Sequence, residues 1–190
     1  MICIIPSIKN YYKDQFEISI DLRLIRYLKK YFKKKVKVLT EISNLDRNCD
    51  LLVISGGNTI YKISKKKKDF IRSKFDNFYL NQALKKKISI LGICHGAQLI
   101  ALNFNSKVKP IRNHVGNHFV TFKNKKYLVN SFHKFGIFKL GKNLKYTSFA
   151  EDNSIESFTN KKKKIIGVMW HPERYKIIKK LDKIILNQWT

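Results

Sequence analysis

The sequence predicts an α/β fold in which a mostly parallel central sheet is flanked by helices. Short continuous runs of apolar residues alternate along the chain with longer segments whose apolar residues recur every three or four positions. The runs are typical of strands covered on both faces, and the longer segments are typical of helices. Their alternation favours a parallel sheet. Because 190 residues, 44% of them apolar, suffice for one core, we expect a single domain over residues 1–190.

The expected elements follow these patterns in chain order. Buried strands are predicted at 1–5, 36–39, 50–55, 88–91 and 165–169, and helices at 18–32, 69–84, 175–186 and, after a Gly-rich turn at 92–98, through residue 102. Short strand-like pieces at 108–111, 118–122, 127–129 and 136–140 predict a small antiparallel excursion. The lysine runs 65–68 and 161–164 are expected to be solvated loops.

The charge of the chain limits the class of partner. Forty Lys and Arg against 13 Asp and Glu give a net charge of +27. Only six of the cations are Arg, and the lysines accompany abundant Ile, Asn and Phe, a bias that A/T-rich coding produces whatever the function. A nucleic-acid binder would favour Arg, whose planar group makes paired contacts to phosphates and guanine edges. We therefore expect no nucleic-acid partner, whereas an anionic small substrate is compatible with the charge.

The sequence also carries signals for location. No apolar segment approaches the roughly 20 residues of a membrane-spanning helix, and the opening residues lack the basic leader and cleavage site of a signal peptide. Three cysteines, an odd number, do not form a disulfide framework. We expect a cytoplasmic protein with no membrane partner.

The segment Gly92-Ile93-Cys94-His95-Gly96 is the most informative part of the chain. Glycines on both sides of the cysteine permit a cramped turn from a buried strand into a helix, which exposes the central side chain as a nucleophile elbow does. Cys94 would then lie at the amino end of a helix, whose dipole favours the thiolate. The pattern predicts that Cys94 is a nucleophile.

A histidine and a carboxylate suited to assist a cysteine nucleophile follow the last predicted strand. A thiolate that attacks an amide needs an acid that protonates the leaving nitrogen, normally a histidine held by a carboxylate. His171 and Glu173 come directly after the strand at 165–169, so they would lie at the same carboxyl edge of the sheet as Cys94. The backbone N–H groups of Gly57 and His95 are the candidates for an oxyanion hole.

Together these segments resemble the class I glutamine amidotransferases. S-G-G after a strand, G-I-C-H-G-A-Q, N-S-F-H and G-V-M-W-H-P-E occur in the order of that family, over roughly residues 50 to 175. The resemblance implies a flavodoxin-like α/β fold, a triad of Cys94, His171 and Glu173, and a γ-glutamyl thioester intermediate, with no metal and no cofactor. Another group of cysteine proteins shares the I-C-H-G turn but lacks a W-H-P-E ending. Because this chain has that ending and the N-S-F-H segment as well, it resembles that group less. The substrate-binding residues implied are Gly56, Asn58, Gln98, Asn130, Ser131, Phe132 and His133.

The sequence says less about the leaving group of the amide than about the triad. S-G-G-N, N-S-F-H and residues 150–157 resemble the γ-glutamyl-γ-aminobutyrate hydrolase branch, from which Lys134 and Asn153 depart. The short chain and the insertion at 111–118 are more similar to the branch that hydrolyses γ-glutamyl-CDP-amidate in capsule biosynthesis. On that resemblance we expect a nucleotide-linked γ-glutamyl substrate, with Arg112, His114 and His118 forming a basic rim that contacts it.

Three alternatives stay open at this point. The chain could be a glutaminase subunit that delivers ammonia to a partner synthase, a hydrolase of small γ-glutamyl amides, or a basic binding protein with an inactive triad. A homodimer is also compatible with the sequence, which does not determine the oligomeric state.

Overall fold

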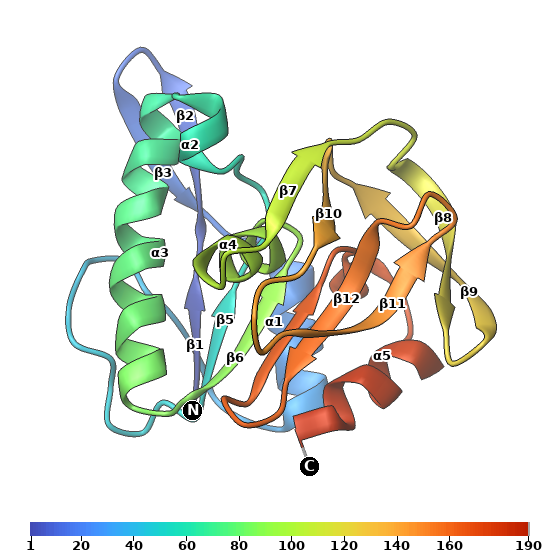
Figure 1. The fold of residues 1–190 in the computed structure, drawn as a ribbon. Helices are drawn as coiled ribbons and strands as arrows, with labels where there is room; N and C mark the ends of the chain where they lie inside the picture. The colour runs from blue at the N-terminus through green and yellow to red at the C-terminus, as the bar shows by residue number, and fades with distance from the viewer. Residues whose placement is uncertain (190) are drawn as a thin grey trace.

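The computed structural model describes residues 1–189, and its centre is one large mixed sheet (Figure 1). One half of the sheet is parallel and follows the predicted alternation of strands and helices. In order across the sheet, this half consists of β4 (Val36–Val38), β1 (Ile2–Ile5), β5 (Leu51–Ile54), β6 (Ser89–Ile93) and β13 (Ile165–Val168).

The other half is antiparallel and extends the sheet beyond β13. It runs through β12 (Ile155–Asn160), β11 (Lys145–Ala150), β8 (Val115–Phe122) and β9 (Lys125–Phe132). Beside this path, β10 (Phe135–Lys139) pairs with β12 and with β7 (Lys107–Pro110). A separate hairpin is formed by β2 (Ser7–Tyr12) and β3 (Gln15–Ser19).

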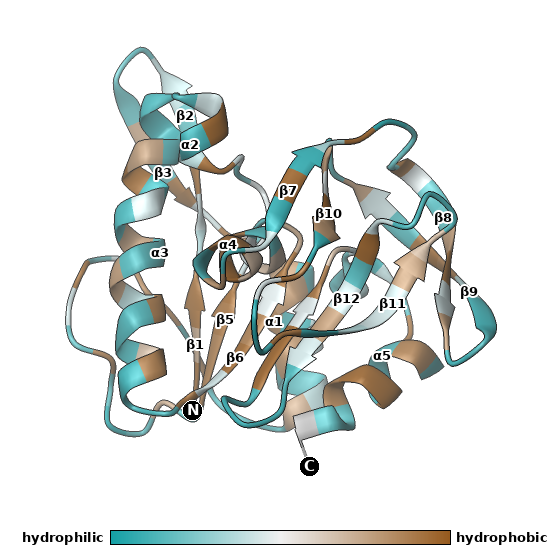
Figure 2. Ribbon diagram, viewed as in Figure 1, coloured by the Kyte–Doolittle hydropathy of each residue, from teal (hydrophilic) through white to brown (hydrophobic). Residues whose placement is uncertain are grey.

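Helices cover both faces of the parallel half (Figure 1). Because side chains of a strand point alternately to opposite faces, Cys3 and Ile5 of β1 pack toward one layer, and Ile2 and Ile4 pack toward the other. Figure 2 shows β1, β5 and β6 as an apolar centre between these layers. The first layer contains α3 (Lys67–Lys85) and α4 (His95–Asn103), and the second contains α1 (Leu22–Phe32) and α5 (Lys180–Leu186).

The predicted fold class is confirmed, and several boundaries are wrong. The first helix begins at Leu22 rather than residue 18, because the Asp21 side chain accepts a hydrogen bond from the Arg23 amide and caps the helix there. The last helix begins at Lys180 instead of 175, after a 3₁₀ turn at Pro172–Arg174. The lysine run 65–68 partly enters α3, whereas residues 161–164 form the expected turn.

Five strands and helices were not predicted: β2 and β3 of the hairpin, the short helix α2 (Tyr61–Ser64), and strands β11 and β12. The antiparallel part is therefore larger than the excursion expected from the sequence. Among the helices of residues 1–189, none combines the length and the apolar character that a membrane span would require.

Candidate active site

Cys94 occupies a sharp turn between β6 and α4. Its backbone has φ 51° and ψ −102°, a conformation that costs a non-glycine residue energy and that marks nucleophile elbows. The turn closes tightly on the sheet, since a Cβ at Gly96 would collide with the carbonyl oxygen of Ile54. Only glycine fits there, so the second glycine of the motif allows α4 to begin directly after Cys94.

His171 and Glu173 form a buried pair that faces Cys94. The Nδ1 atom of His171 lies 2.7 Å from Glu173 Oε1, and both side chains are almost fully buried. Asn130 fixes the backbone at the same point, because its side chain accepts from the His171 amide and donates to the His171 carbonyl, both at 2.9 Å. These contacts hold the imidazole so that Nε2 is left for Cys94.

Gly56 lies directly against the imidazole. A Cβ at this position would be 2.7 Å from His171 Cε1 and 3.4 Å from the Cβ of Cys94. Any side chain would therefore push the histidine away from the cysteine. The paired glycines after β5 thus serve close packing around the triad, in addition to the oxyanion role predicted for the Gly57 amide.

The contacts of His171 determine its protonation. Burial by itself would lower the pKa of His171, but interactions with Cys94 and Glu173 outweigh it and raise that pKa to about 9. At neutral pH the ring is then an imidazolium, and a positive charge beside a cysteine favours its thiolate. The pair is arranged as a nucleophile next to a proton donor, which suits attack on an amide.

A second buried histidine–carboxylate pair lies behind the elbow, and sequence reasoning missed it. His95 Nε2 is 2.8 Å from Asp76 Oδ2, and its Nδ1 is 3.1 Å from the carbonyl oxygen of Asn58. Arg72 Nε donates to Asp76 Oδ1 at 2.7 Å, and the same guanidinium contacts Pro6 and Ser55. Burial opposes ionisation of Asp76, yet Arg72 and His95 hold its pKa below the ordinary value. The signal available in the sequence was the i, i+4 spacing of Arg72 and Asp76 on one helix.

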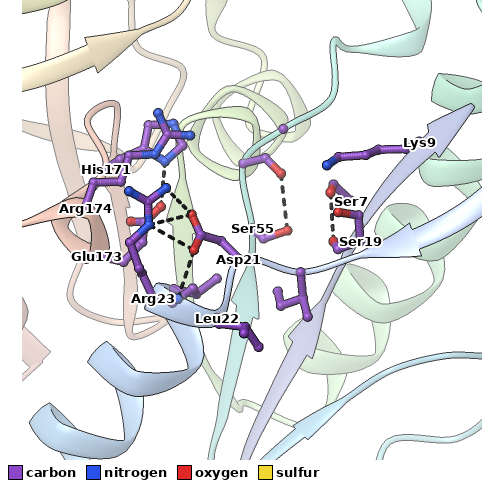
Figure 3. A pocket seen from close by; sticks show the side chains of 14 residues that line it. Ser7, Lys9, Ser19, Asp21, Leu22, Arg23, Ser55, His171, Glu173 and Arg174 are labelled. Atoms are coloured by element: carbon purple, nitrogen blue, oxygen red, sulfur yellow. Dashed lines mark hydrogen bonds and ion pairs between the residues drawn. The ribbon is translucent and has the colours of Figure 1, made fainter. Parts of the chain in front are cut away.

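Two clefts adjoin the triad. The first, about 320 Å³, contains the predicted nucleophile and much of the predicted γ-glutamyl site. The second, about 470 Å³, lies on the Glu173 side of His171, and Figure 3 shows Lys9 across it from Arg23 and Arg174. His171, Gly57 and Arg174 line both. The residues of the first cleft are Gly57, Asn58, Thr59, Cys94, Gln98, Phe132, His133, Lys134, Phe135, His171 and Arg174.

Most predicted substrate-binding residues gather around these clefts. The Gln98 side chain donates to the carbonyl oxygen of Phe135 at 2.9 Å, which fixes it in the first cleft. The Phe132 ring is half exposed, 6.0 Å from the His171 ring, and Arg174 stacks on it at 4.4 Å. Ser131 is fully buried in β9, and the Asn58 side chain is bonded to Ile8 and Asp69.

The three residues predicted for the basic rim do not line either cleft. Arg112 is exposed on the loop before β8. His114 and His118 are turned inward, toward the buried carboxylate of Glu156. The cations that do line the second cleft, Lys9, Arg23 and Arg174, come from the unpredicted hairpin, from α1 and from the turn after His171. Sequence reasoning missed them because lysines and arginines occur throughout the chain.

Comparison with known proteins agrees with this geometry. The family description "Glutamine amidotransferase class-I" matches residues 13–186, nearly the whole chain. The chain belongs to this family. It is 41% identical over 138 residues to the γ-glutamyl-CDP-amidate hydrolase of Campylobacter jejuni, covering 73% of this chain and 68% of that protein. It is 28% identical over 146 residues to a glutamine-hydrolysing GMP synthase subunit of Methanococcus vannielii, covering 70% of each.

Solved structures of the family share the fold. A glutamine amidotransferase from Thermotoga maritima superposes with a TM-score of 0.70 at 18% identity, over 90% of this chain and 75% of that one. A glutamine amidotransferase from Methylobacillus flagellatus has a TM-score of 0.65 at 14% identity, over 92% of this chain and 70% of that one. The class I glutamine amidotransferase fold predicted from the sequence motifs is thereby confirmed, and the chain is an enzyme of this family.

Proposed function

We propose that this enzyme hydrolyses a γ-glutamyl amide whose leaving group carries a nucleotide diphosphate, as in γ-glutamyl-CDP-amidate, with residues 1–190 acting as one catalytic domain. The observation that carries the proposal is the cationic cleft on the Glu173 side of His171, where Lys9, Arg23 and Arg174 outnumber two carboxylates, Asp21, which pairs with Arg23, and Glu173, which pairs with His171. The 41% identity to a γ-glutamyl-CDP-amidate hydrolase supports the same substrate class.

The two clefts suggest how such a substrate would divide. The γ-glutamyl group would enter the cleft that contains Cys94 and Gln98, and the diphosphate would extend past His171 into the cationic cleft. The Nε atom of Arg174 is buried and has no hydrogen-bond partner among the described residues. An unpaired guanidinium N–H is costly unless a ligand accepts from it, and a phosphate oxygen is a suitable acceptor.

In the proposed mechanism, the Cys94 thiolate attacks the γ-carbonyl carbon, and the amides of Gly57 and His95 stabilise the oxyanion. The imidazolium of His171 gives its proton to the leaving nitrogen, the C–N bond breaks, and a γ-glutamyl thioester remains on Cys94. Neutral His171 then takes a proton from water, which hydrolyses the thioester to glutamate and regenerates the thiolate–imidazolium pair. Glu173 orients the ring and stabilises its charge throughout, without receiving the proton.

The test is a comparison of kcat/KM for γ-glutamyl-CDP-amidate, glutamine and γ-glutamyl-γ-aminobutyrate. We expect the nucleotide substrate to be preferred, because remote binding energy from the diphosphate helps position the scissile carbonyl over Cys94. Equal or better use of either other substrate would contradict the nucleotide assignment and leave the triad in place.

Two arginine variants sharpen the test. Arg174→Ala should lower kcat/KM for the nucleotide substrate by about 10- to 100-fold, the value of one or two charge-assisted hydrogen bonds. Arg112→Ala is the matched control, since Arg112 is exposed and lines neither cleft. A large effect of Arg112→Ala with none of Arg174→Ala would instead favour the basic rim predicted from the sequence.

A glutaminase subunit is the second candidate, because the chain is also similar to a glutamine-hydrolysing subunit of GMP synthase. Such a subunit would hydrolyse glutamine well only in the presence of its synthase. Activity of the purified chain alone on the nucleotide substrate would exclude this candidate.

A further inference from the structure

A cluster of three histidines surrounds one carboxylate in the antiparallel half of the sheet. Glu156 of β12 is completely buried, and His114, His118 and His133 are 6%, 15% and 4% exposed. His114 Nδ1 lies 3.3 Å from Glu156 Oε1, His118 Nε2 lies 3.5 Å from Oε2, and His133 Nε2 lies 3.5 Å from Oε1. No step of the proposed hydrolysis uses this cluster.

The polar atoms of the cluster converge without bonding one another. His114 Nδ1, both nitrogens of His118, His133 Nε2 and both oxygens of Glu156 are buried with no hydrogen-bond partner among the described residues. They lie within ion-pair distance of one another, but their lone pairs and protons are not aligned for hydrogen bonds. The buried carboxylate has the three histidines as ion-pair partners but no well-aligned hydrogen bond, and a cation bound by all these atoms would satisfy them together.

The outer nitrogens of two histidines are held in the way that metal-ligating histidines are held. His133 Nδ1 is 3.0 Å from the carbonyl oxygen of Phe135, which leaves Nε2 as the lone-pair nitrogen toward Glu156. His114 Nε2 is 3.3 Å from Asp152 Oδ2, and the other oxygen of Asp152 is fixed by Ser154. Such carbonyl and carboxylate partners set the tautomer and orientation of a ligating imidazole.

We propose that His114, His118 and Glu156 bind a zinc ion, with His133 as the fourth ligand. The ligand atoms of the first three lie within 4.8 Å of one another. A tetrahedral Zn²⁺ with bonds of about 2.0–2.2 Å separates its ligand atoms by about 3.3–3.6 Å. His114 Nδ1 and His133 Nε2 lie 3.3 and 3.5 Å from Glu156 Oε1, whereas His118 Nε2 lies 3.5 Å from Oε2, so the carboxylate or the imidazoles must shift for all ligand atoms to meet one ion. This departs from the expectation, made on the sequence, that the chain holds no metal.

A bound ion would connect strands of the antiparallel half of the sheet to the segment that carries His171. His118 belongs to β8, His133 directly follows β9, and Glu156 belongs to β12, so one ion would join three strands. The backbone of Glu156 accepts from the Met169 amide at 2.8 Å, two residues before His171. His133 adjoins Phe132 in the cleft of Cys94. The role of the ion is structural, because the nucleophile and proton donor of the proposed reaction lie outside its ligand set.

The experiment measures Zn²⁺ binding to untagged protein stripped with a chelator, in a Cys94→Ser background. The Cys94→Ser protein lacks the thiol, so zinc cannot bind to the cysteine at this position. Zinc binding is measured without any substrate, so the result does not depend on the proposed function. Equilibrium dialysis with metal analysis should give one Zn²⁺ per chain, and the melting temperature should rise with Zn²⁺ concentration until the site is saturated. Co²⁺ in place of Zn²⁺ should show the visible absorption of a tetrahedral site.

Glu156→Gln keeps the shape of the side chain and should weaken Zn²⁺ binding at least about tenfold. Glu151→Gln is the matched control, because Glu151 is an exposed acid nearby in the chain, paired with Lys126, and should bind Zn²⁺ as the parent does. If Glu156→Gln does not fold, His118→Gln provides the same measurement at the least buried ligand. Absence of stoichiometric binding in the parent, or unchanged binding in the ligand variants, would overturn the proposal.

Discussion

Two buried histidine–carboxylate pairs flank Cys94, and they differ in what the second ring nitrogen does. In the pair of His171 and Glu173, Nδ1 is bound at 2.7 Å and Nε2 is left toward the cysteine. In the pair of His95 and Asp76, Nε2 is bound at 2.8 Å and Nδ1 is occupied by the Asn58 carbonyl. Similar burial and similar distances therefore leave a ring nitrogen available for proton transfer in the first pair and none in the second.

The difference shows that the chemistry of a buried histidine–carboxylate pair depends on whether the second ring nitrogen of the histidine has a partner within the protein. Asp76 is also shared with Arg72, so the second pair is a closed network that ties α3 to the elbow and to the loop after β5. Glu173 has no cation other than His171 within ion-pair distance among residues 1–189. Substitutions in the first pair should therefore change mainly the rate of hydrolysis, and substitutions in the second should change mainly the stability of the fold.

The largest difference is expected between His171→Ala and His95→Gln. The first removes the proton donor and should lower kcat by about 10²–10⁴-fold or more. The second leaves the backbone amide of His95 in place and should retain most turnover, while the unfolding free energy falls by about 1–3 kcal/mol because Asp76 loses a partner. Steady-state kinetics and chemical denaturation on both variants check this. Comparable losses of kcat in His171→Ala and His95→Gln would contradict the different roles assigned to the two histidines.

Glu173→Gln should reduce activity less than His171→Ala and should also move its pH dependence. The active form has a protonated His171, so the wild-type rate should fall as pH rises through about 9. Loss of the carboxylate charge lowers the pKa of His171, and the alkaline limb of the pH–rate profile should shift to lower pH. A profile with an unmoved alkaline limb would show that Glu173 does not act on the ring electrostatically.

Asp76→Asn should act mainly on stability. Arg72 is fully buried, and removal of its counter-charge should cost about 3–5 kcal/mol of unfolding free energy. Asp50→Asn is the control, because Asp50 pairs with Lys34 and the amino terminus at the surface and should cost little. Denaturant titration of both variants gives the comparison. Equally small losses of unfolding free energy in the two variants would mean that the buried network does not stabilise the fold.

The predictable part of the molecule was the part with a clear apolar pattern. Strands β1, β5, β6 and β13 are continuous apolar runs apart from a few small or polar residues, and the elbow at Cys94 carries its own glycines. The triad was predicted from chemistry and from family motifs. In the structure Cys94, His171 and Glu173 lie together, and their catalytic role stays a prediction.

Much of the missed part was polar and buried, although the hairpin β2–β3 and α2 have few buried residues. All six residues of β12 are buried, but Glu156, Ser157, Thr159 and Asn160 interrupt any apolar pattern. Side-chain bonds such as that between Ser148 and Ser157 at 2.6 Å compensate them, and these bonds join residues of different strands. Arg72 and Asp76 were missed for the same reason, and the inward orientation of His114 was not predicted. A sequence pattern places charges at the surface, whereas here each is buried beside a partner from another element.

The most direct test of the central claim is to find the covalent intermediate on Cys94. The enzyme is mixed with γ-glutamyl-CDP-amidate, quenched rapidly in acid, and analysed by intact-protein and peptide mass spectrometry, with Cys94→Ala treated in parallel. The account predicts a mass increase of one γ-glutamyl group on the peptide that contains Cys94, absent from Cys94→Ala, which should also lack turnover while remaining folded. Turnover by Cys94→Ala, or a glutamyl group carried on another residue, would contradict it.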